Sequence, residues 1–181
     1  MAAVSSRRPA LDLISHSPDQ TRRFGYHLGR LARPGDVILL HGQIGVGKTA
    51  LAQGIAHGLG VEGYVQSPTF TLAGEHAGHT ADGKRATLYH LDLYRLEEAG
   101  ELASFGYEEY FDEPAGIVVI EWPERLAEEV PEEHLLISLE HLADTKRRLA
   151  FLPQGPRAQE MTEAFRAEVF RARRRSTPAG D

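Results

Sequence analysis

The sequence contains no cysteine, and this absence excludes two kinds of stabilisation. Without a thiol among its 181 residues, the chain can form neither a disulfide framework nor a thiolate metal site. Long apolar runs are also missing, since none approaches the roughly 20 residues needed to cross a bilayer. The opening segment MAAVSSRRPALDL lacks the apolar core of a secretory signal. We therefore expect a cytoplasmic protein with no membrane contact.

Lysine is scarce, and the charge of the chain is unevenly distributed. Three lysines stand against seventeen arginines, and the formal net charge is −6. Between Glu97 and Glu133 there are thirteen acidic residues and one basic residue, Arg125. Binding to nucleic-acid phosphates requires a basic face, which this acidic body does not suggest. The acidic stretch is either a solvated surface or a docking face for a basic partner.

Glycine is concentrated at one informative place, the segment GQIGVGKT at residues 42–49. It satisfies G-x-x-x-x-G-K-[ST], in which glycines let backbone N–H groups wrap a phosphate. Lys48 would place a charge at the β- and γ-phosphates, and the Thr49 hydroxyl would bind Mg²⁺. The apolar run DVILLH before the motif predicts a strand, and the apolar spacing after it predicts a helix. The predicted ATP site comprises Gly42, Gln43, Ile44, Gly45, Val46, Gly47, Lys48, Thr49 and Ala50.

The remaining patterns predict an α/β fold of the P-loop NTPase type. We expect three layers, a mostly parallel central sheet and a C-terminal antiparallel hairpin. The predicted domain covers residues 1–156, and the arginine-rich residues 157–181 form an appendage with helical patterning whose order stays open. Further expected elements are a helix capped by Ser17, a turn at 74–85, strands at 86–94 and 116–122, a helix at 97–110, and a hairpin formed by HLLISLEHL and RRLAFLP.

Two carboxylates are candidates for the metal. Asp92 and Glu121 each follow an apolar strand, and ligands of open α/β sheets bind at that end of the strands. A phosphate-bound Mg²⁺ needs such an oxygen ligand; which of the two binds directly stays open. His90 alternates with Asp92 and either orients it or packs. His76 and His79 have no carboxylate cluster nearby and are interpreted as loop residues.

Four motifs occur in order: GQIGVGKT, SPTFTL, HLDLYRL and IEWPE. Together they resemble the bacterial TsaE (YjeE) family of ATPases, over roughly Leu13 to Phe151. The resemblance implies a role in forming threonylcarbamoyladenosine at position 37 of tRNAs that read codons starting with A. It implies TsaD and TsaB as partners, with tRNA reached mainly through that complex. It assigns Ser67 and Thr69 to a switch-like loop beside the nucleotide, and Asp92 and Glu121 to magnesium and hydrolysis.

Catalysis is accordingly assigned to Lys48, Asp92 and Glu121, and the metal to Thr49, Asp92 and Glu121. Gln43 departs from the family's usual aspartate, so a nucleotide-gated binding module with negligible hydrolysis stays an alternative. A small-molecule kinase is a further alternative, although the acidic stretch is a poor lid for phosphates. Trp122 either stacks near the site or belongs to the core.

Overall fold

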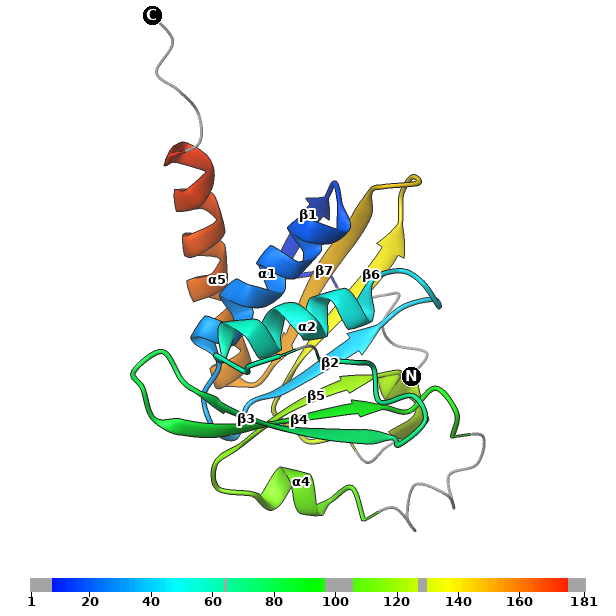
Figure 1. Cartoon of the computed structure of the whole chain (residues 1–181). Coiled ribbons are helices and arrows are strands. Elements are labelled where there is room, and N and C mark those ends of the chain that lie inside the picture. The colour runs from blue at the N-terminus through cyan, green and yellow to red at the C-terminus, as the bar shows by residue number, and fades with distance from the viewer. Residues whose placement is uncertain (1–7, 64, 97–105, 127–129, 176–181) are drawn as a thin grey trace, which may run out of the picture.

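The computed structural model describes residues 8–63, 65–96, 106–126 and 130–175 (Figure 1). Within these ranges, no helix is both long and apolar enough to cross a membrane. The elements in chain order are β1 (Leu11–Ser15), α1 (Pro18–Leu31), β2 (Val37–His41), α2 (Lys48–Gly58), β3 (Ala73–His79), β4 (Arg85–Asp92), α4 (Glu109–Asp112), β5 (Gly116–Glu121), the 3-10 helix η1 (Pro123–Leu126), β6 (His134–His141), β7 (Arg147–Gln154) and α5 (Pro156–Arg175).

The strands form one seven-stranded sheet in the order β1-β7-β6-β2-β5-β4-β3. The central pairs β6–β2, β2–β5 and β5–β4 are parallel, whereas β1–β7, β7–β6 and β4–β3 are antiparallel. The predicted α/β class and the C-terminal hairpin are therefore confirmed. Because β2, β4 and β5 are parallel neighbours, their carboxyl ends meet at one edge, where Asp92 pairs in register with Glu121.

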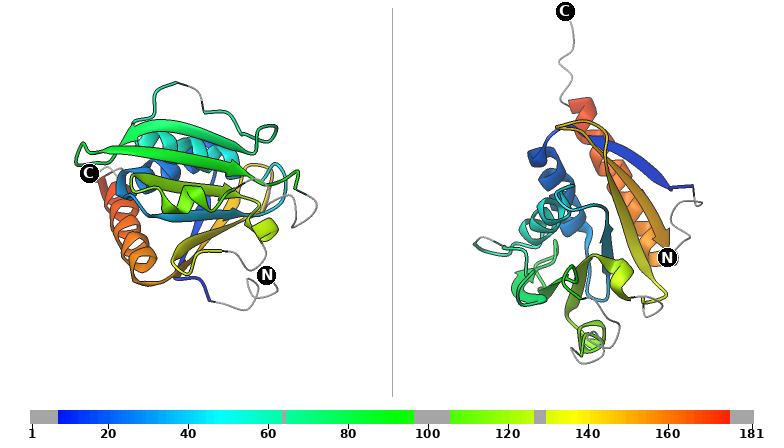
Figure 2. Two further views of the ribbon diagram at one scale, coloured as in Figure 1. Left: turned by 90° about the horizontal axis from the view of Figure 1, so that it is seen from below. Right: turned by 90° about the vertical axis from the view of Figure 1, so that its right-hand side faces the viewer.

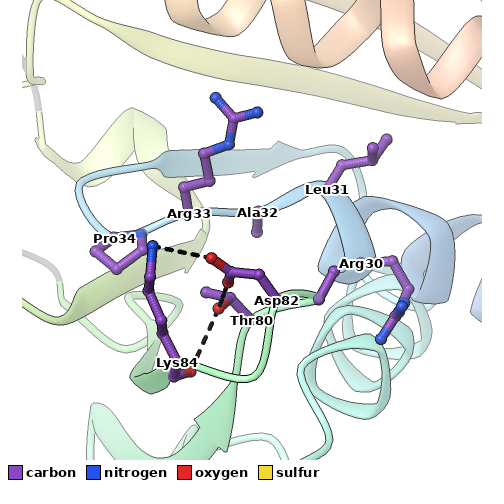
Figure 3. Close-up of a pocket in the computed structure, with 9 residues that line it drawn as sticks. Arg30, Leu31, Ala32, Arg33, Pro34, Thr80, Asp82 and Lys84 are labelled. Carbon is purple, nitrogen blue, oxygen red and sulfur yellow. Dashed lines mark hydrogen bonds and ion pairs between the residues drawn. The ribbon is translucent and has the colours of Figure 1, made fainter.

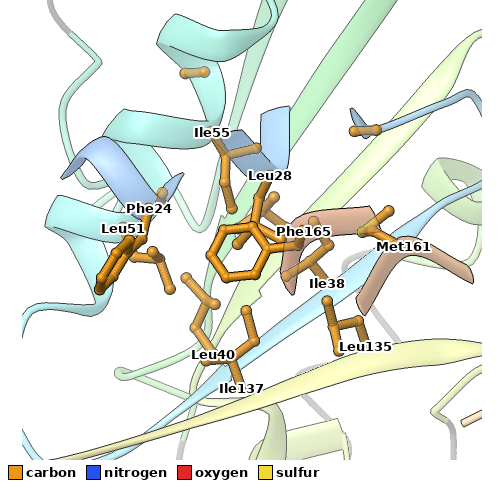
Figure 4. Close-up of a cluster of buried hydrophobic side chains, with 14 of the residues drawn as sticks. Phe24, Leu28, Ile38, Leu40, Leu51, Ile55, Leu135, Ile137, Met161 and Phe165 are labelled. Carbon is orange, nitrogen blue, oxygen red and sulfur yellow. The ribbon is translucent and has the colours of Figure 1, made fainter. Parts of the chain in front are cut away.

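The two faces of the sheet bury separate hydrophobic clusters. Side chains alternate along β2, so Ile38 and Leu40 face one cluster while Val37 and Leu39 face the other. Helices α1, α2 and α5 cover the first face, and Figure 4 shows their apolar side chains meeting those of β2 and β6. The second face packs against the shorter segment that contains α4 and η1. Helices therefore lie on both faces of the sheet, and the layer on the second face is thin.

Helix α5 shares the first cluster, although the sequence left the order of this segment open. Met161, Phe165 and Val169 are buried there. The ring of Phe165 stacks on Phe151 of β7 at 4.9 Å and meets Phe24 of α1 edge-on at 6.1 Å. The division at residue 156 therefore separates two segments that share one hydrophobic core.

Two sequence-based interpretations differ from the structure. The expected turn at 74–85 is wrong, because residues 73–79 form β3 and only the residues between β3 and β4 turn. Cross-strand pairing along β4 outweighs the low strand propensity of the glycine- and histidine-rich segment. Strand β1 was not predicted, although its alternating burial matches a half-buried edge strand. The expected helix at 97–110 lies largely outside the described residues; its described end holds a turn and the first residues of α4.

Helix α1 begins as its sequence predicts. The Ser17 hydroxyl accepts a hydrogen bond from the N–H of Gln20 at 3.1 Å, and the Gln20 side chain accepts one from the N–H of His16 at 2.7 Å. This reciprocal capping satisfies N–H groups that would otherwise lack partners.

Glycines allow the backbones of α1 and α2 to approach each other closely, and the two helices lie side by side on the sheet (Figure 1). A Cβ atom placed on Gly54 of α2 would lie 2.1 Å from the carbonyl oxygen of Arg22, and one on Gly25 of α1 would lie 2.2 Å from that of Leu51. Neither position can hold a larger residue unless the helices separate. This contact between the helices determines the position of the first turn of α2, which contains Lys48 and Thr49.

Candidate functional site

A cavity of about 370 Å³ opens at the carboxyl edge of the sheet, where β2, β4 and β5 end. Four segments that are far apart in the sequence contribute to it: the phosphate-loop segment, the 67–69 loop, the end of β4 and the end of β5. The lining residues are Ile44, Gly45, Gly47, Lys48, Thr49, Ser67, Thr69, Asp92, Tyr94, Glu121 and Trp122.

The phosphate-loop segment leads from β2 directly into α2. Gly45 and Gly47 have φ angles of 74° and 111°, in the left-handed region that other residues rarely adopt. At Gly42, a Cβ atom would lie 2.4 Å from the carbonyl oxygen of Leu139, so the loop also needs the absence of a side chain there. Helix α2 begins at Lys48, and the positive end of its dipole therefore faces the cavity.

Lys48 is buried, with 4% of its surface exposed. Its Nζ atom donates to the carbonyl oxygens of Gly42 at 2.7 Å and Gln43 at 2.9 Å, and lies 3.9 Å from the centre of the Trp122 ring. Burial lowers the pKa of Lys48, and the nearby carboxylates, first Glu121, counteract that shift. The protein thus holds a partly desolvated cation at the bottom of the cavity, where an anionic ligand would stabilise it.

Glu121 is the centre of one hydrogen-bond network. Its Oε2 atom accepts from the Thr49 hydroxyl at 3.0 Å, and its Oε1 atom lies 2.9 Å from Nε2 of His90. The side chains of His90 and Glu121 are 1% and 3% exposed. Nδ1 of His90 has no hydrogen-bond partner in the part of the chain that is described. The sequence suggested that His90 orients Asp92 or packs, whereas the structure has it bonded to Glu121.

Asp92 is the centre of a second network. Its Oδ2 atom accepts from the hydroxyls of Ser67 at 2.5 Å and Thr69 at 2.6 Å, and its Oδ1 atom accepts from the N–H of Tyr94 at 3.1 Å. The two hydroxyls are also within 2.8 Å of each other. Asp92 therefore ties the 67–69 loop to the carboxyl edge of the sheet.

Trp122 has a strained backbone beside these networks. Its φ angle of 61° is uncommon for a large residue, and such strain is often found at functional sites. The indole ring lies 5.0 Å from the Tyr94 ring as well as below the Lys48 ammonium. Trp122 therefore contributes to the cavity wall, although it also contacts the second hydrophobic cluster. Arg95 does not line the cavity; its guanidinium carbon lies 4.0 Å from the ring centre of the exposed Phe70.

The structure gathers most, but not all, of the predicted site residues around the cavity. Lys48, Thr49, Thr69, Asp92 and Glu121 line it, together with Ile44, Gly45 and Gly47. The remaining members of the predicted ATP site do not line it: Gly42, Gln43, Val46 and Ala50. Of these, Gly42 and Gln43 contribute carbonyl oxygens to Lys48.

The oxygen atoms at this edge suit a magnesium ion held partly by phosphates. Thr49, Asp92 and Glu121 supply hydroxyl and carboxylate oxygens, the donors that Mg²⁺ prefers. Within the described ranges, no group of three or more His, Cys, Asp and Glu side chains could enclose a metal ion. An ion that keeps water and phosphate oxygens among its ligands fits such a sparse set, as Mg²⁺ commonly does. His76 and His79 likewise belong to no such group.

A cavity of similar volume lies at the opposite edge of the sheet, beside the residues that precede β2 and β4 (Figure 3). Asp82 there accepts from Thr80 and pairs with Lys84 at 2.9 Å. These contacts lower the pKa of Asp82 to about 2, so the carboxylate stays ionised and is poorly suited to proton transfer. No convergence of buried polar groups comparable to Asp92 and Glu121 occurs among the residues lining it.

Two contacts to the site were missed from the sequence. The N–H of Tyr94 bonds to Asp92, and the guanidinium of Arg147, at the start of β7, donates to the carbonyl oxygen of Val46 at 3.1 Å. The second contact joins residues 101 positions apart, so no local pattern could have indicated it.

Comparisons with known proteins agree on one family. The model of the family described as "Threonylcarbamoyl adenosine biosynthesis protein TsaE" matches residues 15–149. A protein of Treponema pallidum named tRNA threonylcarbamoyladenosine biosynthesis protein TsaE is 41% identical over 136 residues, covering 75% of this chain and 96% of its own. Its namesake in Bacillus subtilis is 36% identical over 147 residues, covering 81% and 88%. The crystal structure of Bacillus subtilis YdiB superposes with a TM-score of 0.71 and 31% identity, covering 87% of this chain and 95% of that one.

Proposed function

Because the chain belongs to the TsaE family of threonylcarbamoyl adenosine biosynthesis proteins, we propose that it is the ATPase of the system that forms this modification in tRNA. The observation that carries the proposal is the convergence of Lys48, Thr49, Asp92 and Glu121 on one cavity at the end of a phosphate-loop motif. The modified base would be adenosine 37 of tRNAs that read codons starting with A. The reaction site itself would lie on the partner proteins TsaD and TsaB.

In this proposal the triphosphate binds between the phosphate loop and the two carboxylates. Lys48 exchanges its carbonyl partners for the β- and γ-phosphate oxygens, which compensates the desolvation of its ammonium group. Thr49, with Asp92 or Glu121, would hold a magnesium ion; when bound, that ion neutralises charge on the phosphates. Backbone N–H groups of the loop and the dipole of α2 further stabilise the negative charge of the phosphates.

Hydrolysis then depends on positioning more than on a strong base. Glu121 is within hydrogen-bonding distance of Thr49 and is itself oriented by His90, so it is placed to orient a water molecule. Asp92 ties the Ser67–Thr69 loop to the site, so a ligand that competes for Asp92 would release or rearrange this loop. We expect slow turnover by the isolated chain and regulation by TsaD and TsaB.

The proposal is tested by reconstitution with purified TsaB and TsaD. ATP turnover is measured with and without these proteins, and threonylcarbamoyladenosine is quantified in tRNA. We expect ATP hydrolysis that changes when the partners are added, and modified tRNA only when all components are present. Modification without any ATP turnover would favour the nucleotide-gated binding module. If the partners neither bind the chain nor alter its turnover, the proposed function is wrong.

Gln43 is examined in the same assay through Gln43→Asp, which introduces the residue usual in the family. The Gln43 side chain is exposed and does not line the cavity. We therefore expect a change in turnover of less than about threefold, because an exposed charge is well screened by solvent. A much larger increase would mean that glutamine at this position limits hydrolysis in this chain.

His90 offers a sharper prediction about Glu121. A glutamine at position 90 can present an amide N–H near the place of Nε2, whereas an asparagine is too short to reach Glu121. We expect His90→Asn to lower the turnover rate about 10- to 100-fold, the usual cost of losing a partner that orients a ligating group. Nucleotide affinity should change much less, and His90→Gln should retain most of the rate. Equal losses in both variants, with equal losses of thermal stability, would contradict this role.

A further inference from the structure

Arg147 joins the phosphate loop to the β6–β7 hairpin. Its Nε atom donates to the carbonyl oxygen of Val46 at 3.1 Å. Its Nη1 atom lies within hydrogen-bonding distance of the carbonyl oxygens of Ala143, Asp144 and Lys146, at 2.9, 3.0 and 3.1 Å. The guanidinium thus connects the turn between β6 and β7 with the loop that precedes α2.

The bond to Val46 determines how one peptide group of the loop is oriented. A trans peptide is planar, so its carbonyl oxygen and the N–H of the next residue point in opposite directions. With the Val46 oxygen held by Arg147, the N–H of Gly47 is turned away from the hairpin. This N–H donates to no other residue in the described ranges, and Gly47 lines the cavity. A phosphate-binding loop requires backbone N–H groups that are free to point at the phosphate.

The charge of Arg147 is also unusually placed. Each of its hydrogen bonds goes to a backbone carbonyl. The neighbouring Arg148 instead binds the carboxylates of Asp12 and Glu140 on the exposed surface. No carboxylate lies in ion-pair distance of Arg147 within the part of the chain described here, so its positive charge is not neutralised by a direct partner. That charge lies next to the phosphate loop, bonded to Val46 but outside the cavity lining, and it favours an anion nearby.

We propose that Arg147 is a positioning residue of the phosphate loop, which holds the Val46–Gly47 peptide in the orientation that binds a phosphate. The inference rests on the proposed function, because it assumes that this loop binds ATP. Its role is distinct from that of Lys48: Lys48 contacts the phosphates, whereas Arg147 acts from the opposite side through the backbone.

The test measures binding of a fluorescent ATP analogue to the full chain, without partner proteins and without need for hydrolysis. Arg147→Gln is expected to weaken binding about tenfold, as for the loss of one charge-assisted hydrogen bond. Arg147→Lys retains the charge but lacks the planar fork, so its affinity should also fall. Arg148→Gln, the matched control on the next residue, should bind as tightly as the wild type.

A purely structural role is separated by Asp144→Gly, which loosens the hairpin turn while the Arg147–Val46 bond remains available. If Asp144→Gly loses as much affinity as Arg147→Gln, the inference is overturned, because any loosening of the hairpin would then suffice. The inference is also overturned if Arg147→Gln, shown by thermal unfolding to be folded, binds the analogue as tightly as the wild type. That result would leave the proposed function intact. A wild-type chain that binds no nucleotide would overturn both.

Discussion

Replacing Lys48 by methionine is expected to weaken ATP binding by at least about 100-fold, because the triphosphate loses its buried cationic partner. Methionine retains an unbranched apolar stem, but it removes the charge together with the N–H donors that bond to Gly42 and Gln43. Hydrolysis should fall to background. Affinity is measured by titration with a fluorescent ATP analogue, and turnover by phosphate release with and without the partner proteins.

The same variant should lose little stability, and this separates binding from folding. Burial lowers the pKa of Lys48, which means that the folded protein disfavours its charged form. Removing the charge therefore relieves a desolvation cost in the protein without nucleotide, which offsets the loss of the hydrogen bonds to Gly42 and Gln43. Thermal unfolding should show a midpoint for Lys48→Met close to that of the wild type, and ATP should no longer raise it. A large drop in the midpoint would contradict this account of the Lys48 environment.

The lowered pKa also predicts the pH dependence of the wild type. As pH rises through the lowered pKa of the folded state, Lys48 loses its proton before the unfolded chain does. Its contribution to stability without ligand therefore increases between the folded and unfolded pKa values, the latter about 10.4. Triphosphate affinity should fall over that same range, because the neutral amine no longer attracts phosphate. An Arg148→Gln control, which leaves the cavity unchanged, should show the same profile as the wild type.

The sequence predicted best those parts of the protein that depend on contiguous residues. The segment from residue 36 to 59 contains its strand, loop and helix in order, and each follows from local spacing. The two carboxylates lie together at the cavity because strand ends of a parallel sheet share an edge, whereas their roles stay a prediction. Their partners were not predicted: Glu121 bonds to His90, and Asp92 bonds to Ser67, through contacts that depend on the register of the strands.

The remaining differences arise where tertiary contacts override local composition. Strand β3 contains glycines and histidines that favour a turn, yet pairing with β4 holds it extended. Helix α5 has the spacing of an amphipathic helix, but only the structure shows that Phe165 lies among side chains of α1, β2 and β7. The helical glycines Gly25, Gly29 and Gly54 raise no expectation individually, because each is simply a poor helix former. Their meaning comes from the facing helix.

Gly54→Ala should destabilise the protein by about 2–3 kcal/mol, although alanine is the better helix former by about 1 kcal/mol. The added methyl would lie 2.1 Å from the carbonyl oxygen of Arg22, which is rigid backbone of α1. The helices must therefore separate, and the apolar contacts between them and with the sheet weaken. Urea unfolding measures the loss. His57→Ala, at an exposed position of the same helix, serves as the control and should change stability by less than about 1 kcal/mol.

A double-mutant cycle shows whether the two helices move as one contact. The methyl of Gly25→Ala would lie 2.9 Å from the Cα atom of Gly54, so both substitutions enlarge the same crossing. Once Gly54→Ala has separated the helices, Gly25→Ala should cost less than it does alone, and the double variant should lose less stability than the sum. Because Lys48 and Thr49 occupy the first turn of α2, the same separation displaces them from Glu121, and ATP affinity should fall together with stability. Additive losses with unchanged affinity would mean that each glycine is accommodated locally and that the crossing does not position the site.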